Sequence, residues 1–369
     1  MDIGKRVSLV DMFREPAEYK PPGTAVEIAA SLDYPNLNSQ QYRLTGKPTP
    51  VNRLYPCLDF VVQNSDELII VAGNDFQGRR WCSSFYGWEA PERALDASKS
   101  CFKRQCRYSI TALKFTKDPN LFLLGNDKGS VELWSTSNPA RGDGFSLYQV
   151  DGQAEHTEGV SAMDVLEAED SKLVTGSNDG CLKVWNWGAH LQSVSTMYGA
   201  HTDEIKGLSA NRKEQSLFVS CSLDKSALLW DLRIPRSASA LFENHKHAFS
   251  TIYWTSKDEA NRLVALGDDA GFVHFVDTRQ PNVFQHSEKV LRKRIHKISF
   301  KGTQFAVIGN TNEVKFYDDR FSLRHECTPA QNYIRDILWE TNLPEESRSS
   351  NRSSCWLIGW NSFFQRVEF

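Results

Sequence analysis

Short apolar runs alternate with Gly, Asn and Asp turns along most of the chain, and this pattern repeats. The clearest copies are GSNDGCLKVW at 176–185, CSLDKSALLWD at 221–231, GNDKGSVELW at 125–134 and GDDAGFVHFVD at 267–277. Each copy has an apolar run, a polar turn, and a second, alternating run that ends near a Trp or its substitute. Because Gly, Asn and Asp tolerate the backbone angles of tight turns, each copy predicts a two-stranded hairpin.

The hairpins recur at a nearly constant spacing. With weaker copies at 73, 309 and 359, successive starts are separated by 42 to 52 residues. A period of this length with one hairpin per repeat is typical of a β-propeller blade. The sequence therefore predicts an all-β protein, a seven-bladed propeller over residues 57–369.

The two ends of the chain predict how this ring closes. Residues 1–56 contain seven prolines and predict an irregular N-terminal arm. The last hairpin runs to Phe369 and leaves no residues for an outer strand. Because open sheet edges are costly, we expect a strand of the arm to pair there and close the ring. The stretches 87–107 and 138–155 predict long surface connections, and 341–355 predicts a flexible insert in the last blade.

Composition narrows the class of protein. A net charge of −3 gives no global reason to expect direct binding to nucleic acid or to an anionic membrane, and no apolar run is long enough for a membrane helix. The N-terminus lacks the apolar stretch of a secretory leader. Eight cysteines without a CxxC pair predict reduced thiols, a cytoplasmic protein with the nucleus left open, and neither a metal site nor a cofactor.

Two neighbouring repeats carry residues that resemble a hydrolytic site. Each repeat has a His, a hydroxyl, an Asp and a Trp, at His156, Thr175, Asp179 and Trp185 and at His201, Ser220, Asp224 and Trp230. A catalytic site would not be duplicated at matched offsets in successive repeats, and no GxSxG elbow is present. We therefore interpret both sets as structural hydrogen-bonded chains. Their pattern resembles the structural tetrad of WD repeats. Elsewhere the Trp is replaced, and we expect Tyr86, Val276 and Tyr317 at its position.

A propeller can also be an enzyme with its site in the central channel. Such a site needs convergent carboxylates or histidines on the innermost strands. The inner strands that the sequence locates, at 112–115 and 161–164, show no repeated catalytic set. We therefore predict that the protein is not an enzyme.

Two further stretches are candidates for partner binding. The turn of the first hairpin, Gly78-Arg79-Arg80-Trp81, places a Trp that the core pattern does not need beside two arginines. An exposed Trp beside cations is typical of an interface anchor, but Trp81 folded back over its own blade explains the pattern equally well. The basic run 289–297 suits an acidic partner or a phosphate backbone, but a solvated strand edge is the simpler interpretation.

With these residues in view, the chain resembles the methylosome WD-repeat subunits, whose insect form is Valois. The likeness covers about residues 57–369. It is strongest in LFVSCSLDKSALLWDLRIPRSAS (217–239), LGDDAGFVHFVDTRQ (266–280), GNDKGSVELW (125–134), KLVTGSNDGCLKVW (172–185) and YIRDILW (333–339).

The resemblance implies a non-catalytic adaptor. Members of that family bind the N-terminal barrel domain of the arginine methyltransferase that makes symmetric dimethylarginine. They present substrates such as Sm proteins, histones and germline Piwi-class proteins, and they assemble as hetero-octamers. In that family an aromatic in a GRxW turn of the first blade enters the enzyme, and the matching residues here are Arg79 and Trp81. With Phe76 and Arg80 near them in the sequence, these are the predicted partner-binding residues. Binding of Tudor-domain proteins in germ plasm is left open. The alternative is a scaffold or substrate receptor in another complex, for ubiquitin ligation or RNP assembly.

The closing strand can be tested by truncation. Deleting residues 1–56 should lower the midpoint of cooperative thermal unfolding of the whole ring, because the seventh blade loses its edge partner. Circular dichroism on the full chain and the truncated chain measures this midpoint. Equal midpoints would contradict an N-terminal closing strand.

Overall fold

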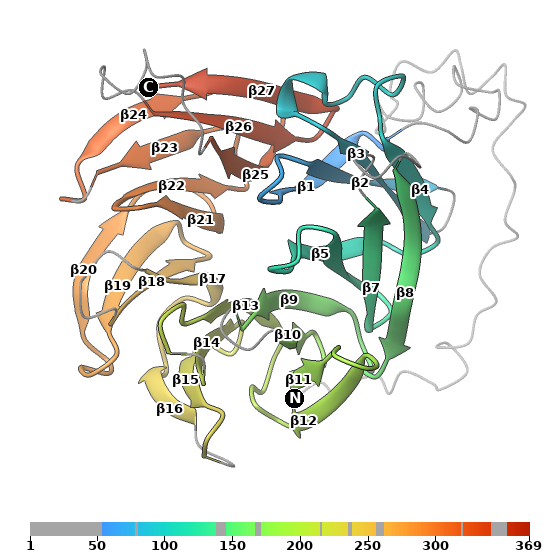
Figure 1. Ribbon diagram of the computed structural model, residues 1–369. Helices are drawn as coiled ribbons and strands as arrows, with labels where there is room; N and C mark the ends of the chain where they lie inside the picture. Colours follow the sequence, from blue (N-terminus) through green and yellow to red (C-terminus); the bar gives the residue numbers. More distant parts are fainter. Residues whose placement is uncertain are drawn as a thin grey trace, which may run out of the picture. The chain divides into compact units, whose positions relative to one another are not determined.

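The computed structural model describes residues 54–77, 80–137, 145–166, 171–214, 216–234, 238–255, 262–318, 320–340 and 353–369. The chain divides into two compact units, 1–51 and 52–369. All the described residues belong to the second unit, in which seven sheets surround a common centre (Figure 1). The predicted seven-bladed, all-β propeller is confirmed.

Each blade is an antiparallel sheet whose strands follow one another in the sequence, starting from the innermost. The first three blades contain β1 (Cys57–Gln63), β2 (Ile69–Gln77), β3 (Arg80–Trp88) and β4 (Phe102–Cys106); β5 (Ile110–Phe115), β6 (Leu121–Asn126), β7 (Ser130–Ser137) and β8 (Ser146–Ala154); and β9 (Val160–Val165), β10 (Lys172–Ser177), β11 (Leu182–Asn186) and β12 (Gln192–Met197). A short 3-10 turn at Pro91–Arg93 precedes β4.

The remaining four blades repeat this order. They contain β13 (Ile205–Ala210), β14 (Leu217–Ser222), β15 (Ala227–Asp231) and β16 (Ala238–Phe242); β17 (Phe249–Trp254), β18 (Leu263–Asp268), β19 (Phe272–Asp277) and β20 (Phe284–Lys289); β21 (Ile295–Lys301), β22 (Gln304–Gly309), β23 (Val314–Tyr317) and β24 (Leu323–Cys327); and β25 (Ile334–Trp339), β26 (Ser354–Gly359) and β27 (Phe363–Glu368). Within the described residues, the seventh blade has three strands. The predicted closing strand falls in residues 1–53, outside the described part of the chain, and stays a prediction.

The outermost strands correct part of the sequence reading. The predicted connections 87–107 and 138–155 contain β4 and β8, so these two stretches are not only loops. Most side chains of β8 are exposed or half-buried on both faces. Because an outer strand has no buried face, its apolar residues do not alternate, and the hydrophobic pattern of the sequence does not predict it.

Every innermost strand has a bulge, and several of the bulged side chains contact a neighbouring blade. In each of these strands one residue is left out of the pairing with the second strand, and the seven residues are Asp59, Thr111, Ser161, Lys206, Ser250, His296 and Arg335. The bulged Ser250 Oγ donates 2.6 Å to the carbonyl of Ile295 in the next blade and 3.1 Å to that of Gly267 in its own. A bulge turns one side chain out of the ladder. At Ser250 it turns the side chain toward the next sheet.

The seventh blade packs against the first through the same level of the ring. Arg335 Nε lies 2.9 Å from Asp59 Oδ1, and the backbone N–H of Val61 donates 3.1 Å to Asp336 Oδ2. Asp336 is buried and also contacts Lys297 of the sixth blade. The N–H of Ser362 donates 2.8 Å to the carbonyl of Pro56. These side-chain and loop contacts bring residues near the two ends of the described chain together.

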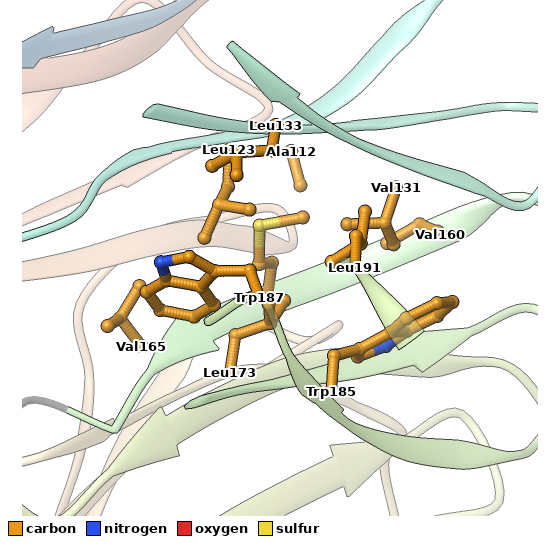
Figure 2. Close-up of a cluster of buried hydrophobic side chains, with 11 residues drawn as sticks. Ala112, Leu123, Val131, Leu133, Val160, Val165, Leu173, Trp185, Trp187 and Leu191 are labelled. Carbon is orange, nitrogen blue, oxygen red and sulfur yellow. The ribbon is translucent and has the colours of Figure 1, made fainter. Parts of the chain in front are cut away.

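Apolar side chains fill the spaces between the blades. The cluster between the second and third blades lies around Met163, Trp185 and Trp187, with the two indoles reaching in from β11 and the residues after it (Figure 2). Its other members come from both sheets, so neither blade buries this surface alone. Within the described part of the chain, we find no helix with the length and apolar character that crossing a bilayer requires.

The junction of blades seven and one can be tested at Asp336. Replacing Asp336 with Ala removes the acceptor of the Val61 N–H and the partner of Lys297. We expect the free energy of unfolding to fall by about 2 kcal/mol, because a buried donor loses its partner. Urea titration followed by tryptophan fluorescence measures this, with exposed Asp66→Ala as the control. An Asp336 variant as stable as the control would show that this junction contributes little.

Candidate functional site

The hairpin of the first blade is longer than its counterparts. By register, the pair Ala72–Phe85 corresponds to Gly176–Leu182, the last pair of the β10–β11 hairpin. The β2–β3 ladder then continues for five further pairs, ending at Gln77–Arg80. At about 3.4 Å per residue, the hairpin extends on the order of 15 Å past the point where β10 and β11 stop pairing.

Two aromatic side chains lie opposite each other near the end of this extension. Phe76 and Trp81 are a cross-strand pair with ring centroids 5.4 Å apart. They are 45% and 44% exposed, and so contact each other while about half of each faces solvent. Trp81 is therefore not buried in the core of its blade, and its ring contact is with Phe76 of its own hairpin. Residues 78 and 79 and the side chain of Arg80 lie outside the described part of the chain.

The register of the first blade corrects the expected place of its core aromatic. In each blade, the residue after the bulge of the innermost strand pairs with a residue of the second strand. Three residues before that second-strand residue is the partner of the Trp position, as in Leu173–Trp185, Phe122–Trp134 and Phe218–Trp230. In the first blade this pair is Ile69–Trp88. Trp88, and not Tyr86, therefore occupies the position, and the prediction for Tyr86 was wrong. Both rings are buried and stacked, with centroids 5.8 Å apart.

The remaining substitutions follow the same register. Val276 pairs with Val264 and Tyr317 pairs with Phe305, so both stand where other blades have Trp. Because Trp88 fills the first blade's position, Trp81 has no role in that core. Its half-exposed indole is available for contact with another molecule.

The structure brings the four tetrad residues of the third blade together. The Trp185 Nε1–H donates 2.7 Å to Thr175 Oγ1, and Thr175 Oγ1 lies 2.8 Å from His156 Nε2. The other ring nitrogen, Nδ1, lies 3.1 Å from Asp179 Oδ2. One direction of protons satisfies every group: the indole donates to the hydroxyl, the hydroxyl donates to Nε2, and Nδ1–H donates to the carboxylate.

The fourth blade has the same chain of contacts. Trp230 Nε1 and His201 Nε2 lie 2.8 Å and 2.7 Å from Ser220 Oγ, and His201 Nδ1 lies 2.9 Å from Asp224 Oδ2. The His loop also contacts the preceding turn, since the His201 N–H donates 3.1 Å to the carbonyl of Gly180. Gly180 has a φ of +73°, and a Cβ there would lie 2.7 Å from the His201 carbonyl oxygen. Each tetrad thus ties the turn of its blade to the loop that enters the same blade, and the backbone N–H of its His ties that loop to the turn of the preceding blade.

In the tetrad of the third blade, electrostatics favours a neutral imidazole beside an ionised carboxylate. Burial lowers the pKa of His156, although Asp179 opposes the effect. Burial alone would raise the pKa of Asp179, but hydrogen bonds from the N–H groups of Cys181 and Thr157 and the nearby His156 hold this pKa below its usual range. Thr175 and Ser220 are fully buried and accept an indole N–H. A substrate cannot reach either hydroxyl, so the arrangement suits a structural role.

The inner strands offer no better arrangement for chemistry among the residues that the structure describes. Asp164 and Asp336 line the central channel. Asp164 contacts Lys114 and accepts the N–H of Ala210 at 2.8 Å, so its oxygens already have partners in neighbouring blades. Asp336 is engaged in the same way at the junction of blades seven and one.

The basic run 289–297 separates into parts with different surroundings. Val290, Leu291 and Ile295 are buried between blades, and Lys297 contacts Asp336. Arg292 and Lys293 remain at the surface, beside a cavity also lined by Tyr333. The run is therefore a connection between β20 and β21 with only part of its charge exposed.

Comparison with known proteins agrees with this geometry. The family model of the WD domain, G-beta repeat, matches residues 149–186 and 191–231, which carry the two tetrads. The chain is a seven-bladed WD-repeat β-propeller. A solved structure, that of Chaetomium thermophilum Sqt1 bound to the N-terminus of ribosomal protein L10, matches this WD-repeat propeller with a TM-score of 0.67 and 14% identity, over 86% of this chain and 87% of that one. At that identity the likeness shows the fold alone.

Two relatives share more of the sequence. The WD-repeat propeller is 27% identical to Protein valois of Drosophila melanogaster over 312 residues, which is 81% of this chain and 84% of that protein. It is 25% identical to Methylosome protein WDR77 of Xenopus laevis over 281 residues, 74% of this chain and 80% of that protein. The resemblance to methylosome WD-repeat subunits is confirmed.

The tetrad can be tested at its shared hydroxyl. Replacing Ser220 with Ala leaves His201 Nε2 and Trp230 Nε1 without their common partner. We expect a loss of about 2 kcal/mol in the free energy of unfolding, because two buried polar groups lose a hydrogen bond. Urea unfolding followed by circular dichroism measures the loss. Ser195→Ala, at an exposed position of β12, is the control, and equal midpoints for the two variants would refute a structural role for Ser220.

Proposed function

We propose that this WD-repeat propeller is a non-catalytic adaptor that binds a type II protein arginine methyltransferase and presents protein substrates to it. The observation that carries the proposal is the half-exposed Phe76–Trp81 pair on the extended hairpin of the first blade. The similarity to Methylosome protein WDR77 and to Protein valois supports the same assignment.

The hairpin has the properties of an anchor. A large rigid aromatic pair loses little conformational freedom on binding and buries much apolar surface, which is why aromatics dominate the energetics of interfaces. In the sequence, Arg79 and Arg80 come directly before Trp81, and arginines provide cations for carboxylates of a partner. We infer that this tip enters the N-terminal barrel domain of the enzyme.

Presentation of substrates requires a second surface. A rigid ring that holds the enzyme at one hairpin leaves its other faces for Sm proteins, histones or germline Piwi-class proteins. Tethering such a substrate beside the enzyme raises its local concentration and lowers the apparent KM without changing the chemical step. The same proposal includes a hetero-oligomer with the enzyme, of hetero-octamer type, a cytoplasmic location with the nucleus left open, and Tudor-domain proteins as further partners.

The assignment of Trp81 can be tested by binding. Trp81→Ala should weaken the affinity for the methyltransferase by about 2 kcal/mol or more, because a buried aromatic anchor loses its contacts. Isothermal titration calorimetry of the purified partners measures the change.

The matched control is Tyr198→Ala, which removes an aromatic that is 80% exposed on the third blade. Equal affinity of the Trp81 variant, the control and the unmodified chain would remove the hairpin from the interface. Affinity purification at moderate salt then distinguishes the partners: stoichiometric methyltransferase supports the adaptor, and a cullin-type ligase in its place would favour a substrate receptor.

A further inference from the structure

The fifth blade lacks the tetrad but keeps its histidine. The N–H of His245 donates 3.2 Å to the carbonyl of Lys225, as those of His156 and His201 do to the preceding turns. At the hydroxyl and Trp positions of this blade stand Leu266 and Val276, which cannot hydrogen-bond an imidazole. His245 therefore occupies a tetrad position without the tetrad partners.

Two other polar side chains approach the same place. Asp268 ends β18, and His274 lies on β19 opposite Leu266. Asp268 and His274 are buried, while His245 is partly exposed. One ligand atom from each of the three residues lies within 4.8 Å of the other two.

The distance between Asp268 and His274 suits two ligands of one ion better than a hydrogen bond. His274 Nε2 lies 3.4 Å from Asp268 Oδ2, longer than the 3.1 Å and 2.9 Å of the His–Asp pairs in the third and fourth blades. Two ligands about 2.0–2.1 Å from a tetrahedral zinc ion are separated by roughly 3.3 Å.

The outer atoms of the cluster are already held. Asp268 Oδ1 accepts the N–H groups of Ala270 at 3.0 Å and Phe272 at 2.7 Å, which leaves Oδ2 facing His274. His274 Nδ1 lies 2.8 Å from Ser287 Oγ. Metal-binding histidines usually donate their second ring N–H to an oxygen in this way, which fixes the tautomer and the ring orientation.

The third ligand is oriented in the same manner. His245 Nδ1 lies 3.0 Å from the carbonyl oxygen of His247 and 3.3 Å from the backbone N–H of the same residue. Donation from Nδ1–H to the nearer carbonyl oxygen leaves Nε2 unprotonated, which is the tautomer that a metal ion requires. Among the described residues, no hydrogen bond to His245 Nε2 is found. In the third and fourth blades both ring nitrogens of the corresponding His are engaged.

We propose that His245, Asp268 and His274 bind a divalent metal ion of the zinc type. Two imidazole nitrogens and one carboxylate oxygen are a donor set that zinc accepts, with a fourth position open to solvent at the partly exposed His245. The ion joins the loop that enters the fifth blade to the hairpin of that blade. In the third and fourth blades the tetrad makes this connection between the entering loop and the hairpin.

Direct binding tests the site. The full chain, stripped with a chelator and dialysed, is titrated with zinc sulfate in a calorimeter, and bound zinc is counted by mass spectrometry after equilibrium dialysis. We expect one equivalent per chain, and at zinc concentrations about 100-fold above Kd a rise of the melting temperature on the order of 5 °C. Failure of the unmodified chain to bind zinc would overturn the proposal.

Variants identify the ligands. His245→Gln and Asp268→Asn should each abolish the equivalent and the thermal shift, and Asp268→Asn keeps an oxygen for the Ala270 and Phe272 amides. The matched control is His201→Gln, which alters the same position of the fourth blade, where the tetrad is complete. It should lower stability and leave zinc binding unchanged.

Cobalt substitution tests whether cysteine thiolates, and not the three proposed ligands, bind the ion. All eight cysteines are free thiols. A cobalt complex of the unmodified chain should show the visible bands of a nitrogen and oxygen site without thiolate charge transfer. A thiolate band, or binding that persists in both His245→Gln and Asp268→Asn, would place the ion elsewhere and contradict the assignment.

Discussion

Contact between neighbouring sheets is the constraint on which the whole ring depends. A blade of three or four strands has two faces, and its apolar side chains leave water only when another blade covers them. The cluster around Trp185 and Trp187 shows this sharing between the second and third blades (Figure 2). No blade is a stable unit alone, so the seventh must pack against the first as firmly as any other pair. The buried Asp336 and the Asp59–Arg335 ion pair lie at that junction.

The bulges and the tetrad histidines both help to connect neighbouring blades, the bulges near the central channel and the histidines farther out. Near the channel, the bulged Ser161 and Ser250 each donate a hydrogen bond to the next blade. Farther out, the ring of the tetrad histidine binds its own blade, and its backbone N–H binds the turn of the preceding blade, as His201 does at Gly180. Because every hydrogen-bonding group in a tetrad has a partner, the connection fixes one relative position of two blades. A ring held in this way presents its loops and hairpins with little conformational entropy left to lose on binding.

The parts of the fold that the sequence predicts are those with one buried face. Second and third strands alternate or run apolar because they lie in the middle of a sheet, and their hairpins gave the correct number of blades. The outer strands β4 and β8 were read as connections, because exposure on both faces removes the pattern. The position of Tyr86 was misjudged for a related reason. The long first hairpin hides where its core begins, and only pairing with β2 shows that Trp88 lies at the Trp position.

The candidate sites differ in how much of each could be predicted from the sequence. The tetrads repeat at fixed offsets, so two copies revealed their structural character before any distance was known. Trp81 was recognisable as surplus, but its exposure depends on the five extra pairs that carry it away from the blade core. The cluster of His245, Asp268 and His274 had no such signal, because it combines residues from a loop and two strands where the repeat has decayed. In the fifth blade the tetrad hydroxyl and Trp are replaced by apolar residues, so His245 lacks the partners that a tetrad histidine has. A buried or half-buried polar group in this position needs other partners. This is the physical reason to look for new chemistry in the repeats that match their family least.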